Sequence, residues 1–146
     1  MQNSSHVVRV LVVDDHEPFR RFVLATLHQR AELQVIGEAS DGLQAVRRAE
    51  ELLPDLIVLD VGLPTLNGIE AAHQISRLVP TATILFLSQN NDADLVAMAL
   101  SNGAKGYVLK LDVTRELLPA VDAVLRGERF ASSSLTQPGA NPTLLP

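Results

Sequence analysis

Five polar or charged residues stand at or directly after the ends of short apolar runs, where they could act on a phosphoryl group. They are Asp14, Asp15, Asp60, Ser88 and Lys110. Carboxylates held close together repel one another, which raises their pKa values unless a cation keeps them ionised. The set offers oxygen ligands without His or Cys, so it favours a hard divalent cation, namely Mg²⁺ with several retained waters.

A lysine and a hydroxyl beside such an ion suit a dianionic phosphoryl group. The ammonium of Lys110 and the cation would share the charge of the phosphoryl oxygens, and Ser88 would donate one more hydrogen bond. A lone aspartate at a strand end is usually a helix cap or turn former, and Asp15 taken alone could be one. The coincidence of these residues at several run ends favours an acidic site over capping.

Five short aliphatic or β-branched runs predict the strands that position these residues. The runs are residues 8–13, 34–39, 56–59, 82–87 and 106–109. Most of them are continuous rather than alternating, which is typical of strands buried on both faces of a parallel sheet.

Apolar residues at helical spacing predict a helix after each strand. The stripes are Phe19, Phe22, Val23 and Leu27; Leu43, Val46, Ala49 and Leu53; Ile69, Ala72 and Ile75; Leu95, Val96, Ala99 and Leu100; and a last pattern over 114–126. Pro18 suits the first turn of its helix, and Asp41 is expected to cap the next one. Pro119 falls inside the last pattern, so that helix either kinks there or residues 114–118 form a separate turn.

Strands that alternate with helices predict an α/β fold with right-handed crossovers and helices on both faces. We expect a doubly wound, five-stranded parallel sheet of order 2-1-3-4-5 with five helices, whose ligands bind where strands 1 and 3 end. Residues 1–7 are expected to be a flexible N-terminus and 8–130 the folded domain. Residues 131–146, rich in Ser and Pro, are expected to be a linker or disordered tail.

Composition excludes several classes of protein. The absence of cysteine excludes disulfides and thiolate metal sites, and His6, His16, His28 and His73 lack the spacing of metal ligands. The net charge of −5 argues against binding of this chain to a phosphate backbone, so we expect no direct DNA binding. No apolar run reaches the roughly 18 residues of a membrane span, and the N-terminus lacks the order of a signal peptide, so we expect a cytoplasmic protein.

Four parts of the sequence resemble the receiver domain of bacterial two-component response regulators. They are residues 10–15 (VLVVDD), residues 60–68 (DVGLPTLNG), Ser88 and residues 103–110 (GAKGYVLK). The resemblance covers residues 8–130 and implies a flavodoxin-like or CheY-like fold. Residues 103–110 and the closing RGERF are most similar to the NarL/LuxR-type subgroup, whose members usually carry a helix-turn-helix domain that we expect to be absent here.

The resemblance implies an acceptor and a metal site. Asp60 would be the phosphoacceptor, and Asp15, Asp60 and the backbone carbonyl of Gly62 would ligate Mg²⁺. Asp14 would act on the ion mainly through water. The chain would then be a signalling switch and not an enzyme, beyond self-catalysed phosphotransfer to Asp60 and its slow hydrolysis.

The resemblance also implies a switch and partners. Lys110 would neutralise the phosphoryl oxygens, Ser88 would bond one of them, and Tyr107 would change rotamer with Ser88. A sensor histidine kinase would donate the phosphoryl group. The output would pass to another protein or to the missing helix-turn-helix domain, with a homodimer after phosphorylation.

Three positions depart from the family pattern, and one of them is Pro119 inside the last helical pattern. Gln89 stands where most relatives have a small residue, so it could crowd the phosphoryl site. Leu111 stands where most relatives have a proline, and we expect a trans bond before it because a cis bond to leucine costs about 2.5–4 kcal/mol.

Two alternatives remain at this stage. A pseudo-receiver would bind partners without phosphorylation, and Gln89 is the best argument for it. A phosphatase of the haloacid dehalogenase type also uses a nucleophilic Asp, Mg²⁺ and a lysine. Its nucleophile follows the first strand in a D-x-D pattern, whereas here Asp14 and Asp15 are adjacent and the pattern is missing.

Overall fold

Buried strands form the centre of the protein in the computed structural model, which describes residues 6–135. Their bounds are β1 Val8–Val13, β2 Leu33–Ala39, β3 Leu56–Asp60, β4 Thr83–Ser88, β5 Gly106–Leu109 and β6 Phe130–Ala131. All neighbouring strands are parallel, in the order β2-β1-β3-β4-β5-β6. Strand β3 is buried along its whole length, including Asp60 at its end, as is typical of a central strand covered on both faces.

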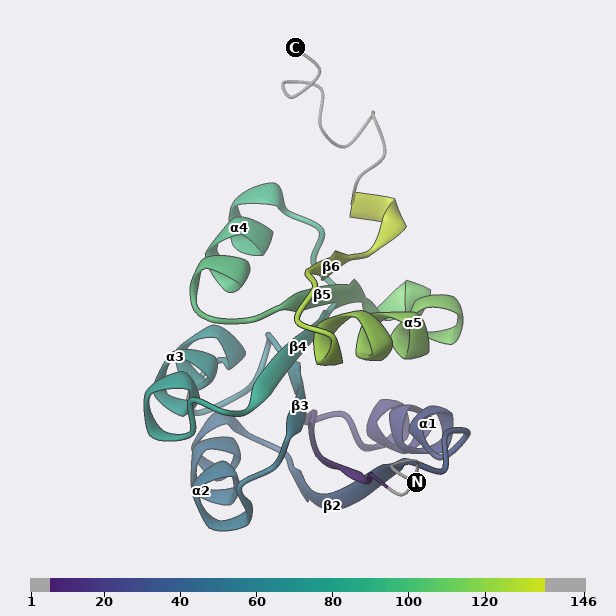
Figure 1. The fold of residues 1–146 in the computed structure, drawn as a ribbon. Coiled ribbons are helices and arrows are strands. Elements are labelled where there is room, and N and C mark those ends of the chain that lie inside the picture. The colour runs from purple at the N-terminus through teal and green to yellow at the C-terminus, as the bar shows by residue number, and fades with distance from the viewer. Residues whose placement is uncertain (1–5, 136–146) are drawn as a thin grey trace.

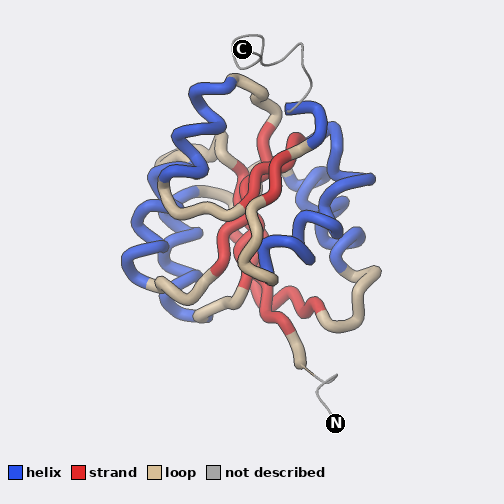
Figure 2. Tube along the Cα trace, turned by 45° about the horizontal axis from the view of Figure 1, so that its top comes forward, coloured by secondary structure: helices blue, strands red, loops and turns tan. Residues whose placement is uncertain are grey.

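Helices cover both faces of this sheet. Their bounds are α1 Glu17–Leu27, α2 Gly42–Leu52, α3 Gly68–Leu78, α4 Ala93–Ser101 and α5 Val113–Leu125, with short 3-10 helices η1 Lys110–Asp112 and η2 Ser133–Leu135. Helices α1 and α5 lie on one face and α2, α3 and α4 on the other (Figure 1). Figure 2 shows the strands between these two helical layers. Each layer packs its apolar face on the sheet, which produces two separate core clusters.

The predicted doubly wound fold is confirmed, and one further strand extends it. The order 2-1-3-4-5 is present, and Phe130 and Ala131 add β6 by pairing with Gly106 and Tyr107 of β5. The crossover through α5 brings the chain back beside β5 in parallel orientation. Two residues are too short a run to show any periodicity, so the sequence pattern missed this strand.

The segment after β6 is bound to β5 as well. The backbone N–H of Ser132 donates to the carbonyl of Tyr107 (2.9 Å), and the Ser132 hydroxyl accepts from the N–H of Leu109 (2.8 Å). Leu135 packs against the core cluster under α4. The domain boundary expected at residue 130 therefore lies within a packed segment that continues to Leu135. The remaining tail, 136–146, and residues 1–5 lie outside the described residues.

Replacing Ser132 with Ala is expected to destabilise the protein by about 1–3 kcal/mol, because it leaves the buried N–H of Leu109 without its acceptor. Urea unfolding measures this difference. Ser101→Ala serves as the control, because Ser101 is exposed at the end of α4. This substitution should change the free energy of unfolding by no more than about 0.5 kcal/mol. Equal stability of the Ser132→Ala and wild-type proteins would contradict a stabilising role for the hydrogen bond between the Ser132 hydroxyl and Leu109.

Pro119 does not divide the last helix. Helix α5 runs through it from Val113 to Leu125, so the alternative in which residues 114–118 form a separate turn is wrong. Leu117, Val121 and Val124 are buried at helical spacing on the α1–α5 side of the sheet. Their packing outweighs the one backbone hydrogen bond that proline removes.

Three expectations about single residues can be compared with the structure. No cis peptide bond occurs within residues 6–135, so the bond before Leu111 is trans as expected. Asp41 caps α2 by accepting from the N–H of Gln44 (2.8 Å), and Pro18 lies in the first turn of α1.

Among the described helices, none is long and apolar enough to cross a membrane.

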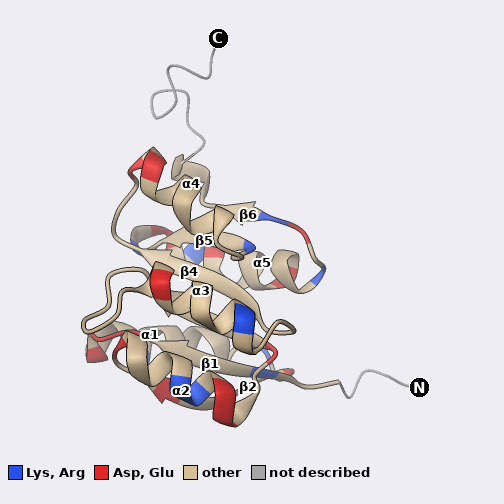
Figure 3. Ribbon diagram, turned by 90° about the vertical axis from the view of Figure 1, so that its left-hand side faces the viewer, with Lys and Arg blue, Asp and Glu red and all other residues tan. Residues whose placement is uncertain are grey.

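Charged residues are distributed unevenly over the helices α2, α3 and α4. Figure 3 shows both acidic and basic residues on α2 and α3, and an acidic residue without basic ones on α4.

Candidate functional site

The predicted site residues meet at the carboxyl edge of the sheet. Asp14 follows β1, Asp60 ends β3, Ser88 ends β4 and Lys110 follows β5. A cavity of about 610 Å³ opens at this edge, and Asp15, Asp60, Ser88 and Lys110 are among the residues that line it. Asp14 lies deeper, with only 1% of its surface exposed. The topological rule for doubly wound sheets thus located the cavity correctly.

Two buried carboxylates share one lysine at the floor of this cavity. The Nζ atom of Lys110 lies 2.8 Å from Oδ2 of Asp14 and 3.3 Å from Oδ2 of Asp60. Each carboxylate also accepts a backbone N–H on its other oxygen, Asp14 from His16 (2.8 Å) and Asp60 from Gly62 (3.1 Å). Buried negative charges are tolerated only with such partners, so the lysine and the loop amides hold both carboxylates in place.

The donor set fits a hard divalent cation. Asp14, Asp15 and Asp60 each offer a carboxylate oxygen within 4.8 Å of the other two. Asp15 is exposed to the open cavity, which leaves room for the waters that Mg²⁺ retains. Gly62 lines the same cavity, and its backbone carbonyl as a further ligand stays a prediction.

The electrostatic environment disfavours ionisation of Asp60. Burial, with 4% of its surface exposed, raises the pKa of this carboxyl above its usual range, and the nearby charge of Asp14 acts in the same direction. The ammonium of Lys110 and the N–H of Gly62 lower the pKa of Asp60 without cancelling the effect of burial. Additional positive charge at this position would therefore be favourable.

This raised pKa predicts a pH-dependent stability in the metal-free protein. Between the unfolded pKa of about 3.8 and the higher folded pKa, the native state holds the Asp60 proton more tightly than the unfolded state, so stability falls as pH rises through that window. We expect Asp60→Asn to stabilise the protein at pH 7 and to lose this advantage as pH approaches 4. Urea unfolding in EDTA across this range measures the difference. A stability difference that is independent of pH would contradict the raised pKa.

Ser88 and Tyr107 are joined through the loop between β4 and α4. The Ser88 hydroxyl accepts from the N–H of Asn90 (2.9 Å), and the Tyr107 hydroxyl donates to the carbonyl of the same residue (2.8 Å). Tyr107 is fully buried in this arrangement, and burial raises the pKa of its phenol. Ser88 and Tyr107 therefore share Asn90 as a hydrogen-bond partner.

Gln89 is an exposed residue of the cavity lining. It directly follows Ser88, the last residue of β4. Its crowding of the phosphoryl site stays a prediction.

Several contacts at the site were not foreseen. The Lys110 ammonium lies 4.6 Å from the centre of the Phe19 ring, a cation–π contact, and Arg20 donates to the backbone carbonyl of Asp14. Asn90 contributes backbone atoms only to Ser88 and Tyr107. None of these contacts has a sequence signal, since residue type does not reveal which loop carbonyl or amide lies within reach. His16, expected to be solvated or packed, caps α1 by accepting from the N–H of Phe19.

Comparisons with known proteins agree with this geometry. The sequence model of the family described as the response regulator receiver domain matches residues 10–122. The chain is 40% identical over 122 residues to the transcriptional regulatory protein LiaR of Bacillus subtilis, which covers 84% of this chain and 58% of LiaR. It is 36% identical over 127 residues to the nitrate/nitrite response regulator protein NarL of Escherichia coli, which covers 87% of this chain and 59% of NarL.

A solved structure shows the same likeness in three dimensions. The crystal structure of a two-component response regulator of the LuxR family from Aurantimonas sp. superposes with a TM-score of 0.88 at 33% identity. The match covers 94% of this chain and 99% of that one. By contrast, the chain spans somewhat less than three fifths of the length of LiaR and NarL, 58% and 59%.

Proposed function

Because the chain belongs to the response regulator receiver family and has its signalling role, we propose that Asp60 accepts a phosphoryl group from a sensor histidine kinase with Mg²⁺. The observation that carries this proposal is the position of Lys110. Its ammonium binds Asp14 and Asp60 together at the floor of a cavity bordered by a third carboxylate, Asp15. An anion-binding group and a cation-binding group thus face the same open space, as phosphoryl transfer requires.

The transfer follows from the chemistry of these groups. A carboxylate oxygen of Asp60 forms a bond to phosphorus while the bond from phosphorus to the donor histidine nitrogen breaks, and the imidazole leaves. Bound Mg²⁺ would supply the charge that screens the acceptor from the donor. The Nζ atom of Lys110 lies 3.3 Å from Oδ2 of Asp60. After the transfer, the ammonium would pair with the phosphoryl oxygens instead of with this carboxylate oxygen.

The output is proposed to be conformational. Ser88 would turn from the N–H of Asn90 towards the phosphoryl oxygens. The carbonyl of Asn90, which accepts from Tyr107, would then shift with its loop, and Tyr107 would change its rotamer. The surface formed by α4, β5 and α5 would change for a partner to recognise.

The partners follow from the relatives. LiaR is described as a transcriptional regulatory protein, and the chain spans 58% of its length. We therefore propose that the state of Asp60 acts through a helix-turn-helix domain or through a separate output protein, and that phosphorylation favours a homodimer. The acceptor ends the third strand, so the site gives no support to the dehalogenase-type phosphatase, whose nucleophile follows the first strand.

The proposed acceptor activity is tested with acetyl phosphate, a small phosphodonor. Intact-mass measurement should show one added phosphoryl group per chain in Mg²⁺ and none in EDTA. Failure to gain this mass at any Mg²⁺ concentration that saturates the site would favour the pseudo-receiver, which binds partners without phosphorylation.

Replacing Gln89 with Ala is expected to raise the rates of phosphorylation by acetyl phosphate and of dephosphorylation. Gln89 belongs to the lining of the cavity, and in-line displacement needs the approach to Asp60 to be clear. Stability should stay within about 0.5 kcal/mol because the residue is exposed. Intact-mass measurement of samples quenched at successive times gives the rates of phosphorylation and dephosphorylation. Equal rates in the two proteins would mean that Gln89 leaves the approach free.

A further inference from the structure

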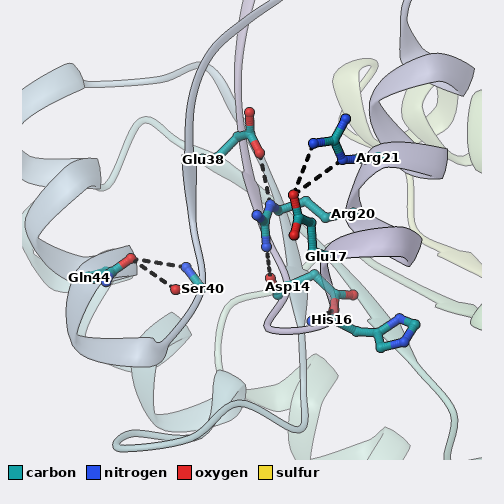
Figure 4. A network of polar contacts seen from close by, with 8 residues as sticks. All are labelled: Asp14, His16, Glu17, Arg20, Arg21, Glu38, Ser40 and Gln44. Atoms are coloured by element: carbon teal, nitrogen blue, oxygen red, sulfur yellow. Dashed lines mark hydrogen bonds and ion pairs between the residues drawn. The ribbon is translucent and has the colours of Figure 1, made fainter.

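Arg20, in the first turns of α1, connects three elements around the acidic site. Its Nη1 atom donates to the backbone carbonyl of Asp14 (2.7 Å), and its Nε atom donates to the carboxylate of Glu38 on β2 (2.8 Å). Figure 4 shows the guanidinium between these two acceptors. The neighbouring Arg21 instead pairs with Glu17 on the same helix and makes no contact with Asp14 in that view.

The backbone carbonyl of Asp14 belongs to the peptide that links the two successive aspartates of the site. The backbone N–H of Asp14 donates to Ala39 on β2 (3.1 Å), so the bond from Arg20 fixes the residue on its other side. The peptide that carries this carbonyl joins Asp14 to Asp15. Its orientation therefore sets the direction of two successive carboxylates, one towards Lys110 and one towards the open cavity.

The guanidinium is suited to this task. Its planar fork can hold two acceptors in fixed directions, which a lysine ammonium on a flexible stem cannot do equally well. Glu38 lies on the edge strand β2, and its ion pair holds Arg20 in the orientation that reaches Asp14.

We propose that Arg20 is a positioning residue for the Mg²⁺ and phosphoryl site, acting by holding the Asp14–Asp15 peptide. This inference rests on the proposed function of the acidic cavity. Arg20 does not touch the reacting atoms, so its effect passes through the two carboxylates that it orients.

Positioning and simple electrostatics predict opposite results. Removing a positive charge near a cation site strengthens the attraction for the cation, so electrostatics alone predicts tighter Mg²⁺ binding when Arg20 is lost. Removing a group that orients the ligands weakens binding, commonly by 10–100-fold for outer partners of metal ligands. The direction of the change therefore separates the two effects.

Isothermal titration of the metal-free protein with Mg²⁺ tests the proposal, with Arg20→Ala compared against Arg21→Ala. Both variants lose one positive charge on the same helix, and only the first loses the bond to Asp14. We expect roughly tenfold weaker Mg²⁺ binding in Arg20→Ala and unchanged or slightly tighter binding in Arg21→Ala. Unchanged or tighter binding in Arg20→Ala would overturn the proposal.

A second variant keeps the test decisive if Arg20→Ala does not fold. Arg20→Lys retains the charge, and its single ammonium replaces the fork that reaches both Asp14 and Glu38. The titration is carried out at a temperature well below the unfolding midpoint of Arg20→Lys. Weaker Mg²⁺ binding by this variant supports the positioning role of Arg20, and an affinity equal to that of the wild-type protein overturns it. Failure of the wild-type protein itself to bind Mg²⁺ would instead be a failure of the proposed function.

Discussion

Asp60→Asn is expected to abolish the binding of beryllofluoride, a mimic of the phosphoryl group, while the protein stays folded. The amide has nearly the shape of the carboxylate, and its oxygen can still accept from the N–H of Gly62. It lacks the negative oxygen that would bond to the beryllium in the cavity next to Lys110. Fluorine NMR in the presence of Mg²⁺ should show one bound equivalent per chain in the wild-type protein and none in the variant.

Glu50→Gln is the matched control for this experiment. It also converts an acidic group to an amide, on the exposed surface of α2 away from the cavity. Beryllofluoride binding should equal that of the wild-type protein. Undiminished binding in Asp60→Asn would contradict the assignment of Asp60 as the acceptor.

Lys110→Met is expected to lower the stability of the metal-free protein by about 3 kcal/mol. The change removes the ammonium shared by Asp14 and Asp60 and leaves both buried carboxylates without it. Breaking a buried ion pair from one side typically costs 3–5 kcal/mol, and the open cavity favours the lower end of that range. Urea unfolding in EDTA measures the loss, and added Mg²⁺ should restore part of it by supplying positive charge.

Lys105→Met is the control, because Lys105 is the only other lysine of the chain and is exposed. The stability of Lys105→Met should stay within about 0.5 kcal/mol of wild type.

In Lys110→Met, affinity for beryllofluoride with Mg²⁺ should also fall by roughly tenfold to a hundredfold, the equivalent of one lost hydrogen bond to a charged group. A metal-free Lys110→Met protein as stable as wild type would show that the ammonium does not compensate the two carboxylates.

The strands and the location of the site follow from local sequence. Uninterrupted apolar runs such as residues 56–59 favour strands buried between two layers, and their alternation with helices indicates a parallel sheet. Parallel strands all end at one edge, so Asp60, Ser88 and Lys110 had to meet there. This is why the cavity could be predicted without coordinates.

Other features depend on packing that no local pattern contains. Pro119 disfavours a helix locally, and the buried face of α5 overrides that preference. Strand β6 has two residues, and it forms because α5 returns the chain to the free edge of β5. Ser132 gives no sign in the sequence that its hydroxyl would accept from the backbone of β5.

The finer geometry of the site was beyond the sequence for the same reason. Spacing did not show that Lys110 would lie nearer to Asp14 than to Asp60, 2.8 Å against 3.3 Å. It also gave no role to Arg20, whose partner at Asp14 is a backbone carbonyl. Contacts to main-chain atoms depend on loop conformation, and they become visible only when the loops are placed.

Phosphorylation of Asp60 is tested most directly by trapping the product with borohydride. The protein is treated with acetyl phosphate and Mg²⁺, and borohydride then reduces an aspartyl phosphate to homoserine while an ordinary aspartate is left intact. Peptide sequencing by mass spectrometry is predicted to find homoserine at position 60 and aspartate at positions 14 and 15. Homoserine at position 14 or 15, or aspartate retained at all three positions in a protein that has bound Mg²⁺, would contradict the assignment of Asp60 as the phosphoacceptor.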